Sequence, residues 1–216
     1  FIYGEGFGIQ FLKWDKVIDN SVVTVYDTKN NAQSENYESE VVKMIGALKK
    51  VGLNKYFDDE IMKTKMVIKV KGGVPHGWWD YIAVEPIDTD LDIRDDYYVH
   101  LHEMTHYYEA QKYHYGFRIT AWVEGIAMTL AEKAMNEMNI PTNDFDTLNR
   151  PVIHLINANQ HNFEDYFLTA SGDDAYVIGY YFIKFLNNNY GDDVILRILK
   201  KVYEANIPAY EWKNQE

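Results

Sequence analysis

The pattern of hydrophobic and polar residues in the N-terminal half of the chain is that of a small sheet with one helix. Ser21–Asp27 (SVVTVYD) is rich in β-branched residues, Lys65–Lys71 (KMVIKVK) alternates hydrophobic and polar side chains, and Asp80–Glu85 (DYIAVE) is a short apolar run. Each of these patterns predicts a strand. Between the first two, Glu38–Val51 has apolar residues at helical spacing, which predicts an amphipathic helix.

From about Arg94 onward the pattern becomes mostly helical, and Ala175–Asn189 is strongly apolar and aromatic. Strands followed by helices, rather than alternating with them, indicate an α+β fold with a small N-terminal mixed sheet and a helical C-terminal lobe. The length of 216 residues fits one domain. We therefore expect a single domain over residues 1–216, with a strand-rich lobe over residues 1–93 and a helical lobe over residues 94–216.

Composition excludes several classes of function. The chain carries 33 acidic and 21 basic residues, a formal net charge of −12, which argues against binding nucleic acid through its phosphates. It contains no cysteine, so disulfides, a cysteine nucleophile and thiolate metal ligands are excluded. Any metal ion must therefore be held by histidine, aspartate or glutamate.

Two features bear on where the chain works. No apolar run is as long as a membrane span, so we expect no membrane-spanning segment. The first residue is Phe1 rather than methionine, which we interpret as a processed or trimmed chain. We expect it to act outside the cell or at the cell surface, after removal of a leader.

The densest cluster of candidate metal ligands is the H-E-x-x-H motif of residues 102–106 (HEMTH). On a helix, residues four apart share a face, so His102 and His106 can each direct one nitrogen to a single ion. Glu103 lies about 100° round the helix from His102, beside the open side of that ion. Two imidazole ligands and a carboxylate that can take a proton from water are the parts of a zinc hydrolase site. The alternative is a pair of surface histidines on a polar helix face.

A catalytic zinc site needs a third protein ligand and an open fourth position. Glu124 is the best candidate because it lies in Trp122–Ala127 (WVEGIA), whose apolar residues predict a buried carboxylate that needs a cation or hydrogen-bond partners. It follows His106 by 18 residues, enough for the motif helix to end and for an antiparallel helix to bring Glu124 beside the histidines. The alternative is a carboxylate bonded to a neighbouring arginine or tyrosine.

Together these elements resemble the gluzincin metallopeptidases, in particular the aminopeptidase N-like enzymes. The resemblance is carried by HEMTH, a short spacer, WVEGIA, and Tyr176–Ile183 (YVIGYYFI), which is similar to the family's Y-x-x-G helix. It implies a thermolysin-like zincin fold with the active-site cleft between its two lobes, and one catalytic zinc ion on the three ligands named above. It also implies that Glu103 is the general base for peptide hydrolysis and that Tyr176 donates a hydrogen bond to the tetrahedral intermediate.

The chain departs from that family at three points. The spacer between the second histidine and the glutamate is one residue shorter than is usual in the aminopeptidase N-like enzymes. The glycine-rich motif that binds a substrate's free amine is absent upstream, and Met128 stands where thermolysin-like enzymes have an aspartate. We therefore expect an endopeptidase, with a zinc exopeptidase or a non-catalytic zinc-containing binding module as the alternatives, and no partner is predicted for the zinc-binding histidines.

In such a fold the edge strand of the sheet holds an extended peptide or protein substrate, and Asp80–Glu85 is our candidate for that strand. Tyr81 and Ala83 are then expected to contact the substrate. Trp78 and Trp79 stand just before them, where they either line the cleft or cover the core.

Acidic residues upstream of the motif resemble the start of a calcium loop, because Asp88, Asp90 and Asp92 stand at alternate positions. Ile93 and Val99 occupy the positions where such a loop has glycine and glutamate. The favoured interpretation is an acidic stretch that complements the dipole of the following helix. A calcium ion is compatible with this family but is not supported by the pattern.

Overall fold

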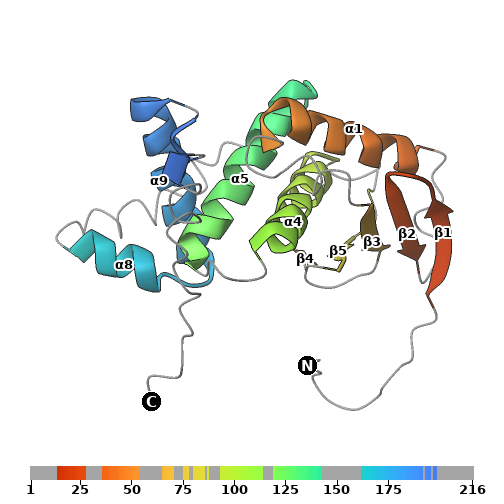
Figure 1. Cartoon of the computed structure of the whole chain (residues 1–216), viewed down its shortest axis with the longest axis horizontal. Helices are drawn as coiled ribbons and strands as arrows, with labels where there is room; N and C mark the ends of the chain where they lie inside the picture. Colours follow the sequence, from red (N-terminus) through yellow and green to blue (C-terminus); the bar gives the residue numbers. More distant parts are fainter. Residues whose placement is uncertain are drawn as a thin grey trace, which may run out of the picture.

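The computed structural model describes residues 14–27, 36–53, 65–70, 75–77, 80–85, 87, 93–113, 119–142, 162–191, 193–195 and 197–198. Within these residues the chain has an α+β fold, with a five-stranded mixed sheet at one end and helices packed beside it (Figure 1). The predicted fold class is confirmed in this respect: a small N-terminal sheet is followed by helices.

The sheet has the strand order β1-β2-β3-β5-β4. Its strands are β1 (Asp15–Asp19), β2 (Val23–Asp27), β3 (Met66–Val70), β4 (His76–Gly77) and β5 (Ile82–Val84). β2, β3 and β5 run parallel in the middle, while β1 and β4 pair antiparallel at the two edges. In β3 the fully buried residues alternate with partly exposed ones, so one face of the sheet packs on the core.

The three predicted strands are confirmed as β2, β3 and β5, but β1 and β4 are not predicted from the sequence. β1 is mostly exposed and so lacks the alternation that marks a half-buried strand. β4 has only two residues and lies within a glycine-rich segment that reads as a loop. Both edges of the sheet therefore come from the segments with the weakest sequence signal.

The expectation that Asp80–Glu85 forms the edge strand is wrong. This segment contains β5, which lies between β3 and β4, so the edge strand at this end is β4. Ala83 pairs with Lys69 on one side and with His76 on the other, and its side chain is fully buried. Ala83 therefore cannot contact a substrate in the way expected, because neither its backbone nor its side chain faces the open edge.

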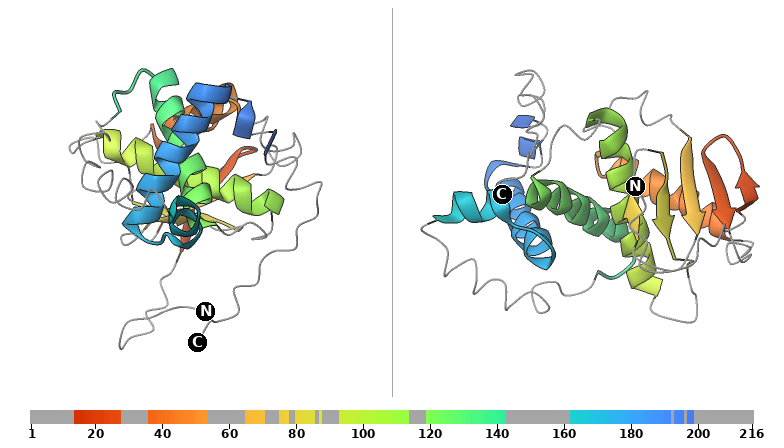
Figure 2. Two further views of the ribbon diagram at one scale, coloured as in Figure 1. Left: turned by 90° about the vertical axis from the view of Figure 1, so that its left-hand side faces the viewer. Right: turned by 90° about the horizontal axis from the view of Figure 1, so that it is seen from below.

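The principal helices form a series of layers beside the sheet. They are α1 (Tyr37–Lys50), α4 (Ile93–Tyr113), α5 (Thr120–Glu137), α8 (Phe163–Thr169) and α9 (Asp173–Tyr190). α1 and α9 confirm the helices predicted from the hydrophobic patterns. Seen from below, α4 lies next to the sheet, α5 beside α4, and α9 beside α5 (Figure 2). Among the described helices, none combines the length and the apolar character needed to span a membrane.

α4 is enclosed on all sides although it carries many polar residues. It contacts β4 and β5 as well as α1 and α5, and no residue from Tyr97 to Gln111 is exposed. Leu101 and Met104 are fully buried in the main core. His102 and Glu103 are buried as well, which requires partners for their polar atoms.

α5 and α9 approach each other closely at Gly125 and Gly179. An ideal Cβ on Gly179 would lie 1.7 Å from the backbone oxygen of Ala121, and one on Gly125 would lie 2.3 Å from the carbonyl carbon of Gly179. No side chain fits at either position, so the contact depends on glycine in both helices. It holds the first turns of α9, which carry Tyr176, beside the first turns of α5, which carry Glu124.

Candidate metal centre

Two neighbouring helices bring the candidate ligands together. His102 and His106 are one turn apart on the same face of α4, and Glu124 lies in the second turn of α5. α4 ends at Tyr113 and α5 begins at Thr120, so the prediction of a helix, a connection and a second helix is confirmed. The two helices are in contact with each other (Figure 1).

The three candidate ligand atoms form a nearly equilateral triangle. His102 Nε2 lies 2.9 Å from His106 Nε2 and 3.0 Å from Glu124 Oε2, and the third edge, from His106 Nε2 to Glu124 Oε2, is 3.1 Å. Ligand atoms about 2.0–2.1 Å from a tetrahedral zinc ion lie roughly 3.3 Å from one another. The donor set and the triangle therefore fit a zinc ion after shifts of a few tenths of an ångström, and within the described residues this is the group able to share one ion.

The electrostatics of the triangle favour a positive charge at its centre. Burial by itself would raise the pKa of Glu124, but hydrogen bonds with His102 and His106 lower it to about 2. Burial lowers the pKa of His102. For His106 the effect of burial is outweighed by the carboxylates of Glu109 and Glu124, which raise its pKa to about 10. A site that holds an ionised carboxylate against an imidazolium is also one that a divalent cation would satisfy.

Glu103 lies beside the triangle and is nearly fully buried, with 7% of its surface exposed. Burial raises its pKa to about 7, despite the opposing charge of His106 and a hydrogen bond from the Gly77 backbone. Its Oε2 has no hydrogen-bond partner among the described residues. A carboxyl whose pKa lies near neutrality, with one oxygen available, is suited to accept and release a proton.

Glu109 is a residue of the site that the sequence reasoning missed. It is buried on α4, one turn after His106, and its Oε2 lies 3.1 Å from His106 Nδ1. A carboxylate that accepts the second N–H of a ligating histidine fixes the orientation and tautomer of the ring. The spacing H-x-x-E after the second histidine was the signal that could have identified it.

Tyr176 lies against the triangle, although more than 20 residues separate it from each ligand in the sequence. Its ring is stacked on the imidazole of His102, with the ring centroids 5.7 Å apart and the planes 21° apart. Burial and the negative charges of Glu124 and Glu103 raise its pKa to about 12, so its hydroxyl is protonated at neutral pH. Its side chain is 39% exposed, and its hydroxyl interacts with the carboxylate of Glu124.

The edge strand that adjoins the metal triangle is β4. An ideal Cβ on Gly77 would lie 2.6 Å from the backbone oxygen of Glu103 and 2.8 Å from the Cβ of His106. β4 therefore rests directly on the motif turn of α4, and glycine is needed for this approach. Tyr81, the other substrate candidate in the described residues, has its ring 3.4 Å from Lys69 Nζ and packs edge-on against His76.

Other predicted residues fall outside the described part of the chain. Trp78 and Trp79, the candidates for the cleft, are among them, as are Asp88, Asp90 and Asp92 of the calcium-like pattern.

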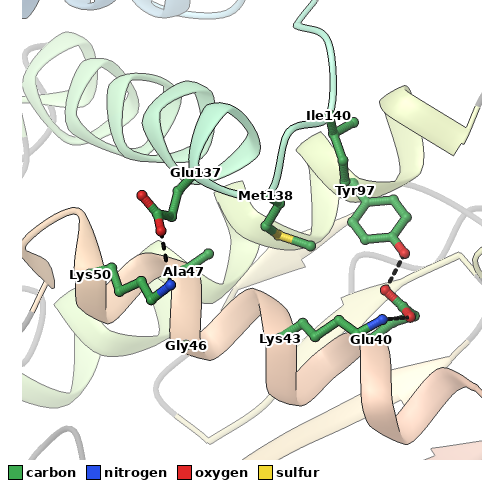
Figure 3. A pocket seen from close by; sticks show the side chains of 9 residues that line it. All are labelled: Glu40, Lys43, Gly46, Ala47, Lys50, Tyr97, Glu137, Met138 and Ile140. Carbon is green, nitrogen blue, oxygen red and sulfur yellow. Dashed lines mark hydrogen bonds and ion pairs between the residues drawn. The ribbon is translucent and has the colours of Figure 1, made fainter.

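A separate cavity of about 670 Å³ lies between α1, the first turns of α4 and the end of α5 (Figure 3). Its charged residues already contact one another: Lys50 Nζ lies 2.9 Å from Glu137 Oε1, while Glu40 accepts hydrogen bonds from Lys43 and Tyr97. None of the triangle residues lines it. Because its charges are paired with each other, the metal triangle is the better candidate for chemistry.

Neither a family model, nor a curated protein, nor a solved structure matches this chain. What the chain does must therefore be inferred from the residues of the site and their geometry.

Proposed function

We propose that this chain is a zinc-dependent peptidase of the gluzincin type, with a thermolysin-like zincin fold. The observation that supports this best is the triangle of His102 Nε2, His106 Nε2 and Glu124 Oε2 beside the buried carboxyl of Glu103. Three protein ligands with an adjacent base are the composition of a catalytic zinc site, whereas structural sites are usually closed by a fourth protein ligand.

The residues around the triangle have distinct roles in this proposal. Zinc held there would polarise a water molecule and a substrate carbonyl. Glu103, with its pKa near neutrality, would take a proton from that water and deliver it to the leaving amine. Tyr176, protonated at neutral pH, would donate a hydrogen bond to the carbonyl oxygen as negative charge develops on it.

A peptide substrate is supported by the position of β4. It is the edge strand of the sheet and it rests on the turn of α4 that carries Glu103 and His106. An extended peptide that adds to a sheet edge gains backbone hydrogen bonds along its length. A peptide paired with β4 would run past the metal triangle, and this arrangement favours cleavage within a chain.

The test of this function is Glu103→Gln. This variant should keep its zinc, measured by metal analysis, and lose hydrolysis of a quenched fluorescent peptide library by at least about 100-fold, because the proton acceptor is removed. The matched control is Glu137→Gln on the surface of α5, which should hydrolyse the library like the wild-type protein. Full activity in Glu103→Gln would overturn the proposal.

The cleavage products decide between the proposed activity and its alternatives. Bound zinc with cleavage inside the peptides supports an endopeptidase. Bound zinc with cleavage only at the chain ends supports an exopeptidase. Bound zinc without turnover in the wild-type protein supports a zinc-containing binding module.

A further inference from the structure

The two candidate zinc histidines are held in different ways. His106 has a hydrogen-bond partner for its second nitrogen, because Nδ1 lies 3.1 Å from Glu109 Oε2. His102 Nδ1 is buried, and no described residue offers it a hydrogen bond. Ligating histidines usually have their second nitrogen fixed by such a partner. Among the described residues, the orientation of the His102 ring therefore depends on the side chains packed against it rather than on a hydrogen bond at Nδ1.

Aromatic rings enclose the imidazole of His102. Tyr176 of α9 is stacked on it at 5.7 Å with the planes 21° apart, and Tyr98, one turn earlier on α4, lies at 6.1 Å with the planes 36° apart. The edge contact with His106 at 4.6 Å limits the ring further. These neighbouring rings restrict rotation of the imidazole about its Cβ–Cγ bond. Tyr176 is the only one of these neighbours that comes from a different helix of the described structure.

We propose that the ring of Tyr176 is a positioning group that holds the imidazole of His102 in the orientation that binds zinc, while its hydroxyl is not needed for this. This inference rests on the proposed zinc site. It gives Tyr176 a second role, through its ring, besides the hydrogen bond that its hydroxyl is proposed to donate. The glycine contact between α5 and α9 supports it, because that contact holds α9 at a fixed distance from the site. Loss of the ring should weaken zinc binding more than loss of the hydroxyl, which interacts with Glu124 and should mainly reduce turnover.

The test compares Tyr176→Phe, which keeps the ring, with Tyr176→Leu, which removes it. Zinc affinity is measured without substrate, by competition with a chromophoric chelator, and the spectrum of the cobalt(II)-loaded protein reports the ligand geometry. Tyr176→Phe keeps the ring and loses only the interaction of the hydroxyl with Glu124, so it should bind zinc within about threefold of the wild-type protein and lose turnover. Tyr176→Leu should bind zinc about tenfold more weakly, which is the lower end of the effect of removing a partner of a metal ligand, and its cobalt spectrum should change.

The matched control is Phe185→Leu, which removes an aromatic ring from the exposed face of the same helix. It should leave zinc affinity and the cobalt spectrum unchanged, and circular dichroism shows whether each variant is folded. Wild-type zinc affinity and spectrum in folded Tyr176→Leu would overturn the inference, as would equal weakening in Tyr176→Phe. A wild-type protein that does not bind zinc would instead overturn the proposed function itself.

Discussion

Gly179→Ala tests whether α9 is placed against the candidate metal centre by direct contact with the backbone of α5. The added Cβ would lie 1.7 Å from the backbone oxygen of Ala121 and 2.9 Å from the backbone nitrogen of Gly125. Ordinary van der Waals contact begins at 3.4 Å, so the first distance is too short by roughly 1.7 Å. Both neighbours are backbone atoms inside a helix and cannot rotate away, so the helices must separate.

The separation has two expected consequences. Overpacking of this kind typically costs about 1–3 kcal/mol, which for a chain of this size lowers Tm by roughly 2–12 °C. Tyr176 lies one turn before Gly179 and moves with it, away from His102 and Glu124. A misplacement of about 1 Å near a reaction centre can reduce the rate about 100-fold, so turnover should fall far more than stability alone explains.

The assay combines thermal unfolding with peptide hydrolysis at saturating zinc, where the ligands on α4 and α5 are still occupied. Gly46→Ala is the control, because a Cβ added at this helical position has no atom within 4 Å, so it should raise stability by about 0.5–1 kcal/mol. If Gly179→Ala unfolds at the wild-type temperature and hydrolyses peptides at the wild-type rate, the close contact between the helices is not what positions Tyr176.

Substitutions at three further positions test the surroundings of the site and the core of α4. Glu109→Ala should weaken zinc binding by about 10- to 100-fold, because His106 loses its hydrogen-bond acceptor, and Glu109→Gln should weaken it less. Chelator competition measures both affinities, and equal zinc affinity in the wild-type protein and the two variants contradicts this role of Glu109. Gly77→Ala puts a Cβ 2.6 Å from the backbone oxygen of Glu103, so it should displace β4. In steady-state kinetics the variant should raise KM for long peptides more than it lowers kcat, and an unchanged KM refutes this. Burial lowers the pKa of His100 from 6.5 to about 4, so its neutral form stabilises the fold above pH 6.5 and this contribution is lost as the pH falls through 4. The raised pKa of Glu103 adds stability over the same range in both proteins, so the prediction concerns the difference between them. In urea unfolding of the chelated proteins, the wild-type protein should lose up to about 3 kcal/mol more than His100→Gln over that range, and equal pH profiles contradict this.

The parts of the fold that could be predicted are those with a local periodic signal. β2 and β3 are rich in β-branched residues or alternate in polarity, and α1 and α9 place apolar residues at helical spacing. The order of strands in the sheet depends on pairing between distant segments, which no local pattern encodes. That is why the pattern of Asp80–Glu85 predicts a strand but not its place in the sheet, and why the two-residue β4 carries no strand signal of its own.

The candidate site shows the same division. His102 and His106 are four residues apart on one helix, so their shared face follows from helix geometry alone. Glu124 could be predicted because a carboxylate among apolar residues needs a partner. Glu109 stands at an equally local spacing from His106, but a glutamate three residues from a histidine on a helix is common and does not by itself indicate a partner for a metal ligand. The approach of Gly77 to Glu103 is a tertiary contact that the sequence does not reveal.

The burial of α4 on every side limits how this chain can change. A helix such as α1, in which exposed and buried positions alternate with the helical period, accepts many substitutions on its outer face without effect on folding. From Tyr97 to Gln111, α4 has no exposed residue, so it has no solvent-facing side on which side chains can be exchanged freely. Substitutions should therefore accumulate slowly along this helix, and variation among proteins of this kind should concentrate on exposed positions such as those on the outer face of α9.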